Sequence, residues 1–393
     1  MKKNLLNVHP DVIKLGIVSF LTDVSSEAIF SVFSIFFTVV AGASAALLGV
    51  VEGLADFSAS SLDYLAGWLA DRSGKNKPLT LLGYLFSTLA KTTLLVANSV
   101  TALVIFRVIE RLGKSFRGPP RDAWLSAVAE KSSRGYAFGV HKALDKSGAI
   151  LGPLLAYYVL NRFGQNLRAF HILFIGAVIA AALAVIVLAF MKDHPTQAPK
   201  RENIFKAWGT LSNSFKLFLI PAGIFSLAYF SFGFLLLRAY TIGFSIKDVV
   251  LLYALFNVAF VIVAVPVGKL GDFIGRKSII ILEYLIYIIM CLGFVFTTQK
   301  WEVIVLFILF GVFYSIDEAQ SKAFIADIEK DRRATAIGMY NFTTGLVYLP
   351  ASAIAGALWV LHPTYAFGFA AIITFIAMGA FIFLQPKISD KNF

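Results

Sequence analysis

Hydrophobic residues in this chain gather in runs of about 20 residues, and short polar segments separate the runs. A run of that length, wound as an α-helix, crosses the roughly 30 Å of hydrocarbon in a bilayer. β-Strands do not explain the pattern, because the strands of a membrane barrel are about 10 residues long and alternate in polarity. The pattern predicts an all-α integral membrane protein with twelve transmembrane helices, near residues 15–39, 45–69, 79–98, 100–128, 136–160, 169–191, 217–244, 249–268, 278–298, 302–327, 335–360 and 365–385.

One polar segment is longer than the others. It begins at Met191, reads MKDHPTQAPKRENIFKAWGTLSNS, and leaves six predicted helices on either side. The sequence therefore predicts an N-terminal six-helix bundle in residues 1–192, a linker in residues 193–213 and a C-terminal six-helix bundle in residues 214–393.

The two halves resemble each other in sequence. GWLADRSGKNKPLTLLGYL from Gly67 matches GKLGDFIGRKSIIILEYL from Gly268, and each segment joins the second and third helices of its half. A weaker match pairs RGYAFG at Arg134 with RATAIG at Arg333. Two related bundles of this kind bind a solute near the middle of the membrane and rock against each other. The sequence thus predicts two pseudo-symmetric bundles.

Composition supports a membrane protein, since 58% of the residues are hydrophobic and only 15% are charged. The net charge of +12 does not indicate nucleic-acid binding, because most basic residues fall in the loops of one side. By the positive-inside rule these loops, the linker and both termini are cytoplasmic. The N-terminal segment MKKNLLNVHPDVIKLG shows no cleavable signal pattern, and we expect it to be a retained cytoplasmic tail of a multi-pass protein in the bacterial inner (plasma) membrane.

Few sequence features favour enzymatic chemistry. Cys291 is the single cysteine, which excludes an internal disulfide framework and a cysteine metal cage. No HExxH, CxxC or GxSxG motif occurs. We therefore expect no enzymatic activity, no bound metal and no cofactor, with a proton gradient as the driving force. A receptor that transports nothing is a further alternative.

Paired loop motifs resemble a known family over nearly the whole chain. The segment from Gly67 contains, in order, glycine, a small residue, aspartate, arginine and a basic tail. The segment from Gly268 is a degenerate copy of it. These segments are similar to the signature loop of major facilitator superfamily secondary transporters. The resemblance implies that fold, and a conformational latch between helix ends formed by Gly67, Asp71, Arg72, Gly74, Gly268, Asp272, Gly275 and Arg276.

The fifth predicted helix carries a second resemblance. In GVHKALDKSGAILGP, Gly139, Gly148, Gly152 and Pro153 have the spacing of a motif of the family's drug/proton antiporters, where it shapes a bend that limits leak. That motif usually ends in a glycine pair, which Ala156 and Tyr157 replace here. A plain packing seam of small residues is the alternative.

The fourth predicted helix is unusually charged. By resemblance, Arg107 takes the place of an intramembrane arginine of proton-driven members, and Glu110 stands where they commonly have glutamine. At about 100° per residue, Arg107, Arg111, Lys114 and Arg121 fall within a stripe less than about 90° wide. Each charge costs about 2.5–3.5 kcal/mol at the bilayer centre. We therefore expect these side chains to be paired, or to face water or substrate.

Other predicted helices supply possible partners. Carboxylates near arginines can change protonation as a cavity opens to either side. We expect proton coupling at Asp23, Glu27, Glu110, Asp145 and His141, with static ion pairs as the alternative. We expect substrate contacts from Arg107, Arg111, Lys114, Arg117, Glu52, Asp56, Lys146, Asp317, Glu318 and Lys322.

The excess of cations predicts a small organic solute that is anionic or amphipathic, since arginine suits carboxylate recognition. The sequence favours proton-coupled export by a monomer embedded in the lipid bilayer. Proton-coupled uptake of a charged nutrient or a siderophore-like metal chelate is the alternative, because a fold does not fix direction.

Overall fold

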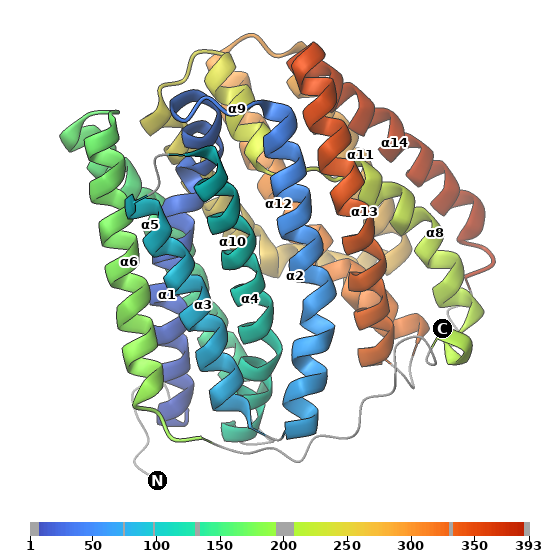
Figure 1. The fold of residues 1–393 in the computed structure, drawn as a ribbon. Coiled ribbons are helices and arrows are strands. Elements are labelled where there is room, and N and C mark those ends of the chain that lie inside the picture. The colour runs from blue at the N-terminus through green and yellow to red at the C-terminus, as the bar shows by residue number, and fades with distance from the viewer. Residues whose placement is uncertain are drawn as a thin grey trace. The chain divides into compact units, whose positions relative to one another are not determined.

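The computed structural model of the protein describes residues 8–73, 75–96, 99–129, 134–193, 208–329 and 333–388, and within them it is helical with no strand. The described residues form thirteen α-helices; their arrangement is drawn in Figure 1. In the first half they are α1 (Pro10–Ile35, extended by a π-helical turn, Phe36–Val40), α2 (Ala45–Ser73), α3 (Asn76–Val96), α4 (Val100–Val128), α5 (Arg134–Phe163) and α6 (Leu167–Ala189).

A short 3₁₀ turn, Trp208–Thr210, precedes the second half. Its helices are α8 (Asn213–Ala228), α9 (Gly233–Thr241), α10 (Ile246–Ile274), α11 (Arg276–Phe296), α12 (Lys300–Ile328), α13 (Arg333–Leu361) and α14 (Pro363–Leu384). Every predicted helix overlaps an observed one, and the seventh is divided into α8 and α9. The expected all-α fold of twelve membrane segments is confirmed.

Two details of helix α4 and of the seventh segment differ from the sequence pattern. Pro119 and Pro120 lie inside α4, and the helix continues to Val128 although proline has no N–H to donate to it. Trp124 and Leu125, which follow the prolines, are fully buried, and their packing stabilises the last turns. The break between α8 and α9 had no expected counterpart.

Eight of the described helical segments are long and apolar enough to cross a membrane by length and composition. They include α1, α3, α6, α8 with α9, α10, α11, α13 and α14. The remaining long helices are α2, α4, α5 and α12, and these carry most of the charged candidate residues.

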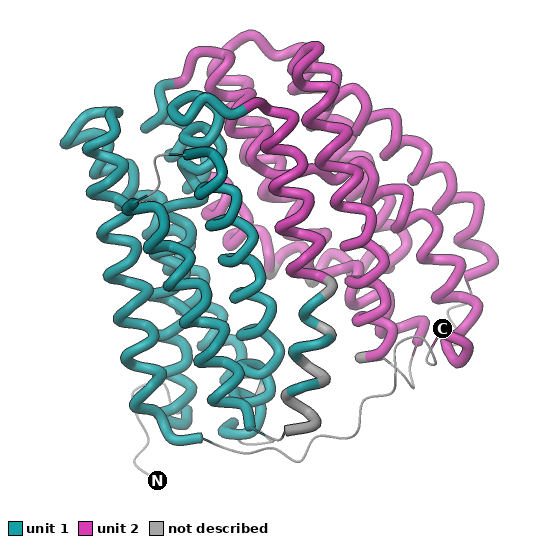
Figure 2. The backbone as a smooth tube through the Cα atoms, in the orientation of Figure 1, with its two compact units in different colours: residues 1–43, 61–201, 245–254 teal, residues 44–60, 202–244, 255–393 magenta. Residues whose placement is uncertain are grey.

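The chain forms two compact units, shown in Figure 2. Unit 1 comprises residues 1–43, 61–201 and 245–254, and unit 2 comprises residues 44–60, 202–244 and 255–393. The start of α2 therefore packs within unit 2, and the start of α10 packs within unit 1. Each unit thus contains the start of one helix from the other half of the sequence.

Glycines allow close helix packing in unit 1. A Cβ atom on Gly148 would collide with the carbonyl oxygen of Phe20, so α5 lies directly against α1 there. Gly83 on α3 and Gly113 on α4 face each other in the same way, and a Cβ on Gly83 would lie 2.6 Å from the Gly113 carbonyl oxygen. Small residues permit such backbone approach between membrane helices.

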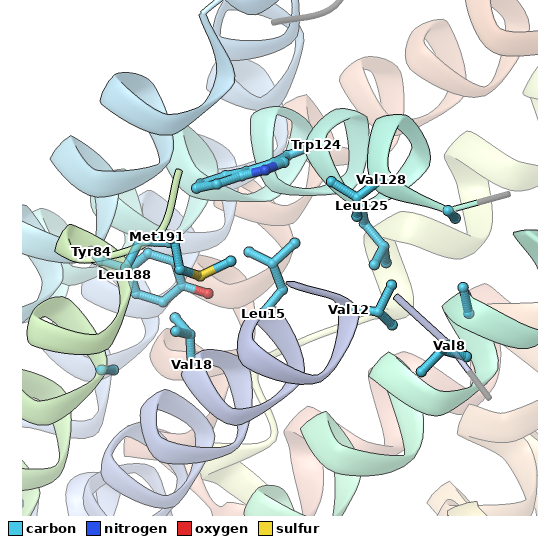
Figure 3. Packing of buried hydrophobic residues seen from close by; sticks show 13 residues of the cluster. Val8, Val12, Leu15, Val18, Tyr84, Trp124, Leu125, Val128, Leu188 and Met191 are labelled. Atoms are coloured by element: carbon cyan, nitrogen blue, oxygen red, sulfur yellow. The ribbon is translucent and has the colours of Figure 1, made fainter. Parts of the chain in front are cut away.

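A hydrophobic cluster joins the helix ends of unit 1, as Figure 3 shows. Trp124 and Leu125 of α4 pack with Leu15 of α1, Tyr84 of α3 and Leu188 of α6. Beside this cluster, the Lys77 Nζ donates hydrogen bonds of 2.8 Å and 2.5 Å to the carbonyl oxygens of Ala189 and Met191 at the end of α6. Lysine at this place satisfies the last carbonyls of the helix.

Unit 2 repeats that cap. The Lys277 Nζ donates hydrogen bonds of 3.2 Å and 2.9 Å to the carbonyl oxygens of Gln385 and Ile388, just after α14. Lys77 and Lys277 lie in the two related loop segments of the sequence. The internal repeat therefore extends to a shared hydrogen-bonding role.

Candidate functional site

The charged face of α4 lies against α1 in unit 1. The guanidinium of Arg107 lies over the ring of Phe30, with its central carbon 4.3 Å from the ring centroid, and Arg111 approaches the same ring at 5.2 Å. Arg107 also lies 5.6 Å from the Phe33 centroid. An aromatic face attracts a cation through its quadrupole, most strongly where water is excluded. Phe30 and Phe33 thus position two of the expected substrate-binding cations.

Glu110 supplies negative charge to this face. Its side chain is completely buried, and its Oε2 lies 3.8 Å from Arg107 Nη1, an ion pair without hydrogen-bond geometry. Within the described residues neither Glu110 oxygen has a hydrogen-bond partner. A buried carboxylate with neighbouring cations and unused acceptor oxygens is suited to bind a proton or a donor group from a solute.

Lys91 of α3 is a charged group of this site that sequence reasoning missed. Its side chain is completely buried, and its Nζ donates 2.9 Å hydrogen bonds to the hydroxyls of Ser25 and Ser26 on α1. Lys91 also interacts electrostatically with Glu110. The signal was available, because Lys91 is a lone charge inside an apolar run.

Arg117 completes the α3–α4 contact. Its Nη1 donates a 2.5 Å hydrogen bond to the hydroxyl of Ser87, and its guanidinium lies 4.9 Å from the Tyr84 ring centroid. The close approach at Gly83 and Gly113 makes this short bond possible. Arg117, like Arg107, is almost completely buried.

The expected proton carriers Asp23 and Glu27 lie on α1, one turn apart and partly exposed. Asp23 interacts electrostatically with Lys114 and Arg117, and Glu27 accepts a hydrogen bond from the Tyr253 hydroxyl at the start of α10. The cations of α4 and the carboxylates of α1 therefore belong to one group. We call Asp23, Glu27, Lys91, Arg107, Glu110, Arg111, Lys114 and Arg117 the unit 1 polar cluster.

The fifth helix places its own charged residues beside this cluster. His141 Nε2 lies 3.0 Å from the Ser19 hydroxyl, which also accepts a 3.2 Å hydrogen bond from Arg121. Asp145 forms a 3.7 Å ion pair with Lys142 and interacts electrostatically with Lys146. His141 and Asp145 lie one turn apart, interact electrostatically with each other and both interact with Arg121.

The glycines of the fifth helix have different surroundings. A Cβ on Gly148 would lie 3.1 Å from the Asp23 Cβ, and one on Gly152 would lie 3.2 Å from the Glu27 Cβ. Gly139 has open space, and Pro153 lies inside α5. Gly148 and Gly152 therefore set the position of α1 and its two carboxylates.

Unit 2 contains the other expected substrate-binding residues. Glu52 Oε2 accepts a 3.1 Å hydrogen bond from the Ser231 hydroxyl, in the break between α8 and α9. Asp56 interacts electrostatically with Tyr348. Asp317 of α12 interacts with Glu318, Lys322 and Glu283. Glu283 of α11, a lone acidic residue in an apolar run, was missed from the sequence.

Most of the expected latch lies outside the described residues. This applies to Gly74 and to the side chains of Asp71, Arg72 and Asp272, and no contacts are described for Gly67 and Gly268. Gly275 has φ of +88°, which favours glycine, and lets α10 turn directly into α11. Arg276 donates a 2.6 Å hydrogen bond to Gln320 and lies 3.4 Å from Asp327. In the second copy, Arg276 therefore links α11 to α12.

Comparison with known proteins identifies the family. A sequence model of the Major Facilitator Superfamily matches residues 15–299 and 222–393. An uncharacterized MFS-type transporter of Methanocaldococcus jannaschii is 35% identical over 386 residues, covering 95% of each chain. The chain belongs to the major facilitator superfamily.

Two further comparisons concern a relative in sequence and a protein of the same fold. Multidrug resistance protein 2 of Bacillus subtilis is 25% identical over 338 residues, covering 83% of each chain. The crystal structure of a D-xylose-proton symporter is 17% identical and superposes with a TM-score of 0.76, covering 97% of this chain and 98% of the other. The expected fold and family are confirmed, and the protein is a multi-pass membrane transporter of a small-molecule substrate.

Membership in the superfamily gives the unit 1 polar cluster its context. Among the described residues, no group of three or more His, Cys, Asp or Glu side chains is placed to hold a metal ion. The cationic and carboxylate side chains of the cluster are suited to bind ions, protons and hydrogen-bonding solutes. Its cations come from α3 and α4, and its carboxylates come from α1 and α4.

Proposed function

We propose that this protein exports a small organic solute, anionic or amphipathic, in exchange for protons. It does so in the inner (plasma) membrane as a monomer with both termini in the cytoplasm. The predicted bundles in residues 1–192 and 214–393 rock against each other, and the paired loop motifs hold one state. Export is supported by the similarity to a multidrug resistance protein.

The unit 1 polar cluster supports an anionic solute as the substrate in this proposal. It contains five cationic side chains and three carboxylates, and Arg107, Glu110, Arg117 and Lys91 in it are at most 5% exposed. The cluster therefore has more cationic than anionic side chains, and this net positive charge favours an anionic group on the solute. Arg107 and Arg111, held over one ring, present planar donors that suit a carboxylate.

Asp23, Glu27 and Glu110 are the proposed proton carriers, with His141 and Asp145 at the edge of the cluster. Protonation of Glu110 neutralises a carboxylate that interacts with Arg107 and Lys91. Binding of a solute anion adds a negative charge beside the same cations. The protonation of the carboxylates and the occupancy of the cations are therefore coupled.

Proton-driven uptake is a second candidate, and this coupling supports it. A proton on Glu110 leaves Arg107 available for an anion, so proton and anion stabilise each other's binding, as symport requires. Antiport requires that the two compete. The sign of the coupling therefore separates the two candidates.

Flux measurements in proteoliposomes test the site. With an organic anion selected by thermal shift, we expect Arg107→Ala to reduce the initial rate of pH-driven flux about tenfold or more, as loss of a charged hydrogen bond implies. Arg111→Ala should reduce it as well, and Asp23→Asn should uncouple flux from the pH gradient. Lys14→Ala is the matched control, because Lys14 is exposed and pairs only locally with Asp11. Unchanged flux and coupling in all three variants would overturn the site assignment.

The release or uptake of protons when the solute binds distinguishes exchange from symport. Solute binding that releases protons supports export by exchange, and binding that takes up protons supports symport. No solute flux in either direction, with folded protein, contradicts both and leaves a receptor.

A further inference from the structure

A pair of carboxyl groups lies inside unit 2, and neither member belongs to the unit 1 polar cluster. Glu283 of α11 and Asp317 of α12 lie close enough for a hydrogen bond between their carboxyl groups. Two ionised carboxylates cannot form such a bond, because neither has a proton to donate. The pair therefore holds one proton, as close carboxyl pairs do.

The two members of the pair differ in access. Glu283 is 1% exposed, and among the described residues its Oε2 has no hydrogen-bond partner. Asp317 is partly exposed. A buried carboxyl oxygen without a partner indicates a group that binds something else during the protein's cycle. Asp317 is the member that a solute reaches first.

Aromatic rings surround the pair. The ring of Tyr229, the residue directly after α8, stacks on that of Tyr287 of α11 with centroids 6.3 Å apart and lies 5.5 Å from that of Tyr348 of α13. The ring centroid of Phe313 of α12 lies 4.6 Å from that of Tyr287. Asp317 interacts electrostatically with five tyrosines, which are Tyr229, Tyr284, Tyr287, Tyr340 and Tyr348. Carboxylates beside tyrosine rings have the chemistry that recognises an ammonium group.

Several tyrosine hydroxyls already have partners inside the protein. Tyr287 donates a 3.0 Å hydrogen bond to the carbonyl oxygen of Ala228, and Tyr340 and Tyr348 form hydrogen bonds with Ser321 and Thr344. Ring faces are therefore the larger part of what these residues offer a solute. This favours an organic cation over a bare metal ion, which prefers oxygen ligands.

Two further charges face Asp317 from its own helix. Lys322 and Glu318 both interact with it and have opposite signs. A proton and a monovalent cation both carry one positive charge. Exchanging one for the other leaves the net charge of Glu283, Asp317, Glu318 and Lys322 with the bound ion unchanged. Such an exchange avoids the cost of an additional buried charge.

We propose that Glu283, Asp317 and the five tyrosines form a carboxyl–tyrosine site that binds the ammonium group of an amphipathic organic cation in exchange for one proton. The cation binds against Asp317 and the rings, and the Glu283 carboxyl releases its proton to water. This inference goes beyond the proposed anion site and shares no residue with it. It would give the protein a competition between solute and proton, which is the coupling that export by exchange needs.

Binding of benzyltrimethylammonium to the purified full-length protein tests the site. The probe has a permanent charge and no proton of its own, so any proton released comes from the protein. We expect about one proton released per probe bound in weakly buffered solution. The apparent Kd should fall about tenfold for each unit of rising pH over the range where the pair titrates.

Variants distinguish the roles of the residues. Glu283→Gln keeps a hydrogen-bond donor for Asp317, so the probe should still bind, with no proton release and a flat pH profile. Asp317→Asn should weaken binding about tenfold or more, and Tyr229→Leu should weaken it while Tyr229→Phe does not. Glu302→Gln is the matched control, because glutamine also completes the capping box at the start of α12.

The outcomes separate clearly once thermal melting shows each variant to be folded. Wild-type binding without proton release, or Glu283→Gln that still releases a proton, overturns the exchange. No binding of the probe to the wild-type protein overturns the site. Because the probe is a cation and the readout is binding, these results are independent of the organic-anion flux assays.

Discussion

Lys91 and Glu110 interact as oppositely charged groups that are both completely buried. Removing one member of such a pair leaves the other without compensation, which costs about 3–5 kcal/mol in a buried pair. We expect Lys91→Met and Glu110→Gln each to lower the melting temperature of the purified protein. The double variant should lose less than the sum of the single losses.

A double-mutant cycle measures that difference. A coupling energy of about 1–3 kcal/mol is expected for residues in one charged network. Additive losses within about 0.5 kcal/mol would show that the two groups do not stabilise each other, and that Lys91 acts only through its hydrogen bonds to Ser25 and Ser26.

The sequence showed which residues carry charge, and the structure shows how they are oriented. Arg107 and Glu110 stand out because they are ions inside an apolar run, and Lys91 and Glu283 carry the same signal more weakly as single charges. Their partners were not predictable. Contact of Arg107 with Phe30 depends on the rotation of α1 about its own axis, which residue spacing within either helix does not specify.

At the scale of helices, the α1–α5 seam gives a matched pair of glycine substitutions. A Cβ on Gly148 collides with the Phe20 backbone, and one on Gly139 meets nothing within 4 Å. Gly148→Ala should therefore destabilise the protein by about 1–3 kcal/mol, as overpacking does. Gly139→Ala should be neutral or stabilise by up to about 1 kcal/mol, because alanine favours the helix.

Thermal melting of the two variants checks this prediction. Equal melting temperatures would contradict the close contact at Gly148. The glycines of the fifth helix would then affect the bend of the helix and not its packing on α1. If Gly148→Ala instead melts lower but keeps its flux, the seam stabilises the fold without limiting leak.

Helix positions followed from the sequence more reliably than helix interruptions. Runs of about 20 apolar residues located every membrane segment, because lipid forces backbone groups to bond within a helix. The break between α8 and α9 was not foreseen, since AYFSFGF reads as one apolar run. There the Ser231 N–H donates to the Ser352 hydroxyl at 3.2 Å, and its own hydroxyl bonds Glu52. Those partners are remote in sequence and replace the helical hydrogen bonds.

At the scale of the whole molecule, α2 and α10 are each divided between the two units. Within unit 2, the start of α2 packs tightly on α13, where a Cβ on Gly53 would lie 2.8 Å from the Leu349 carbonyl oxygen. Within unit 1, the start of α10 bonds α5 through Lys247 and Asn161, whose Nζ and Oδ1 atoms lie 2.9 Å apart. Any motion of one unit against the other must bend these two helices or break such contacts.

Cross-linking the start of α10 to α5 tests whether these contacts open during transport. We expect a cleavable bis-methanethiosulfonate linker between Lys247→Cys and Asn161→Cys, in a Cys291→Ser background, to reduce flux about tenfold or more. Reductant should restore it, because only the linker holds the helices together. Each single-cysteine variant treated with the same reagent is the control. Full flux with a complete cross-link would mean that α10 and α5 stay together throughout the cycle, and that the movement lies elsewhere along the divided helices.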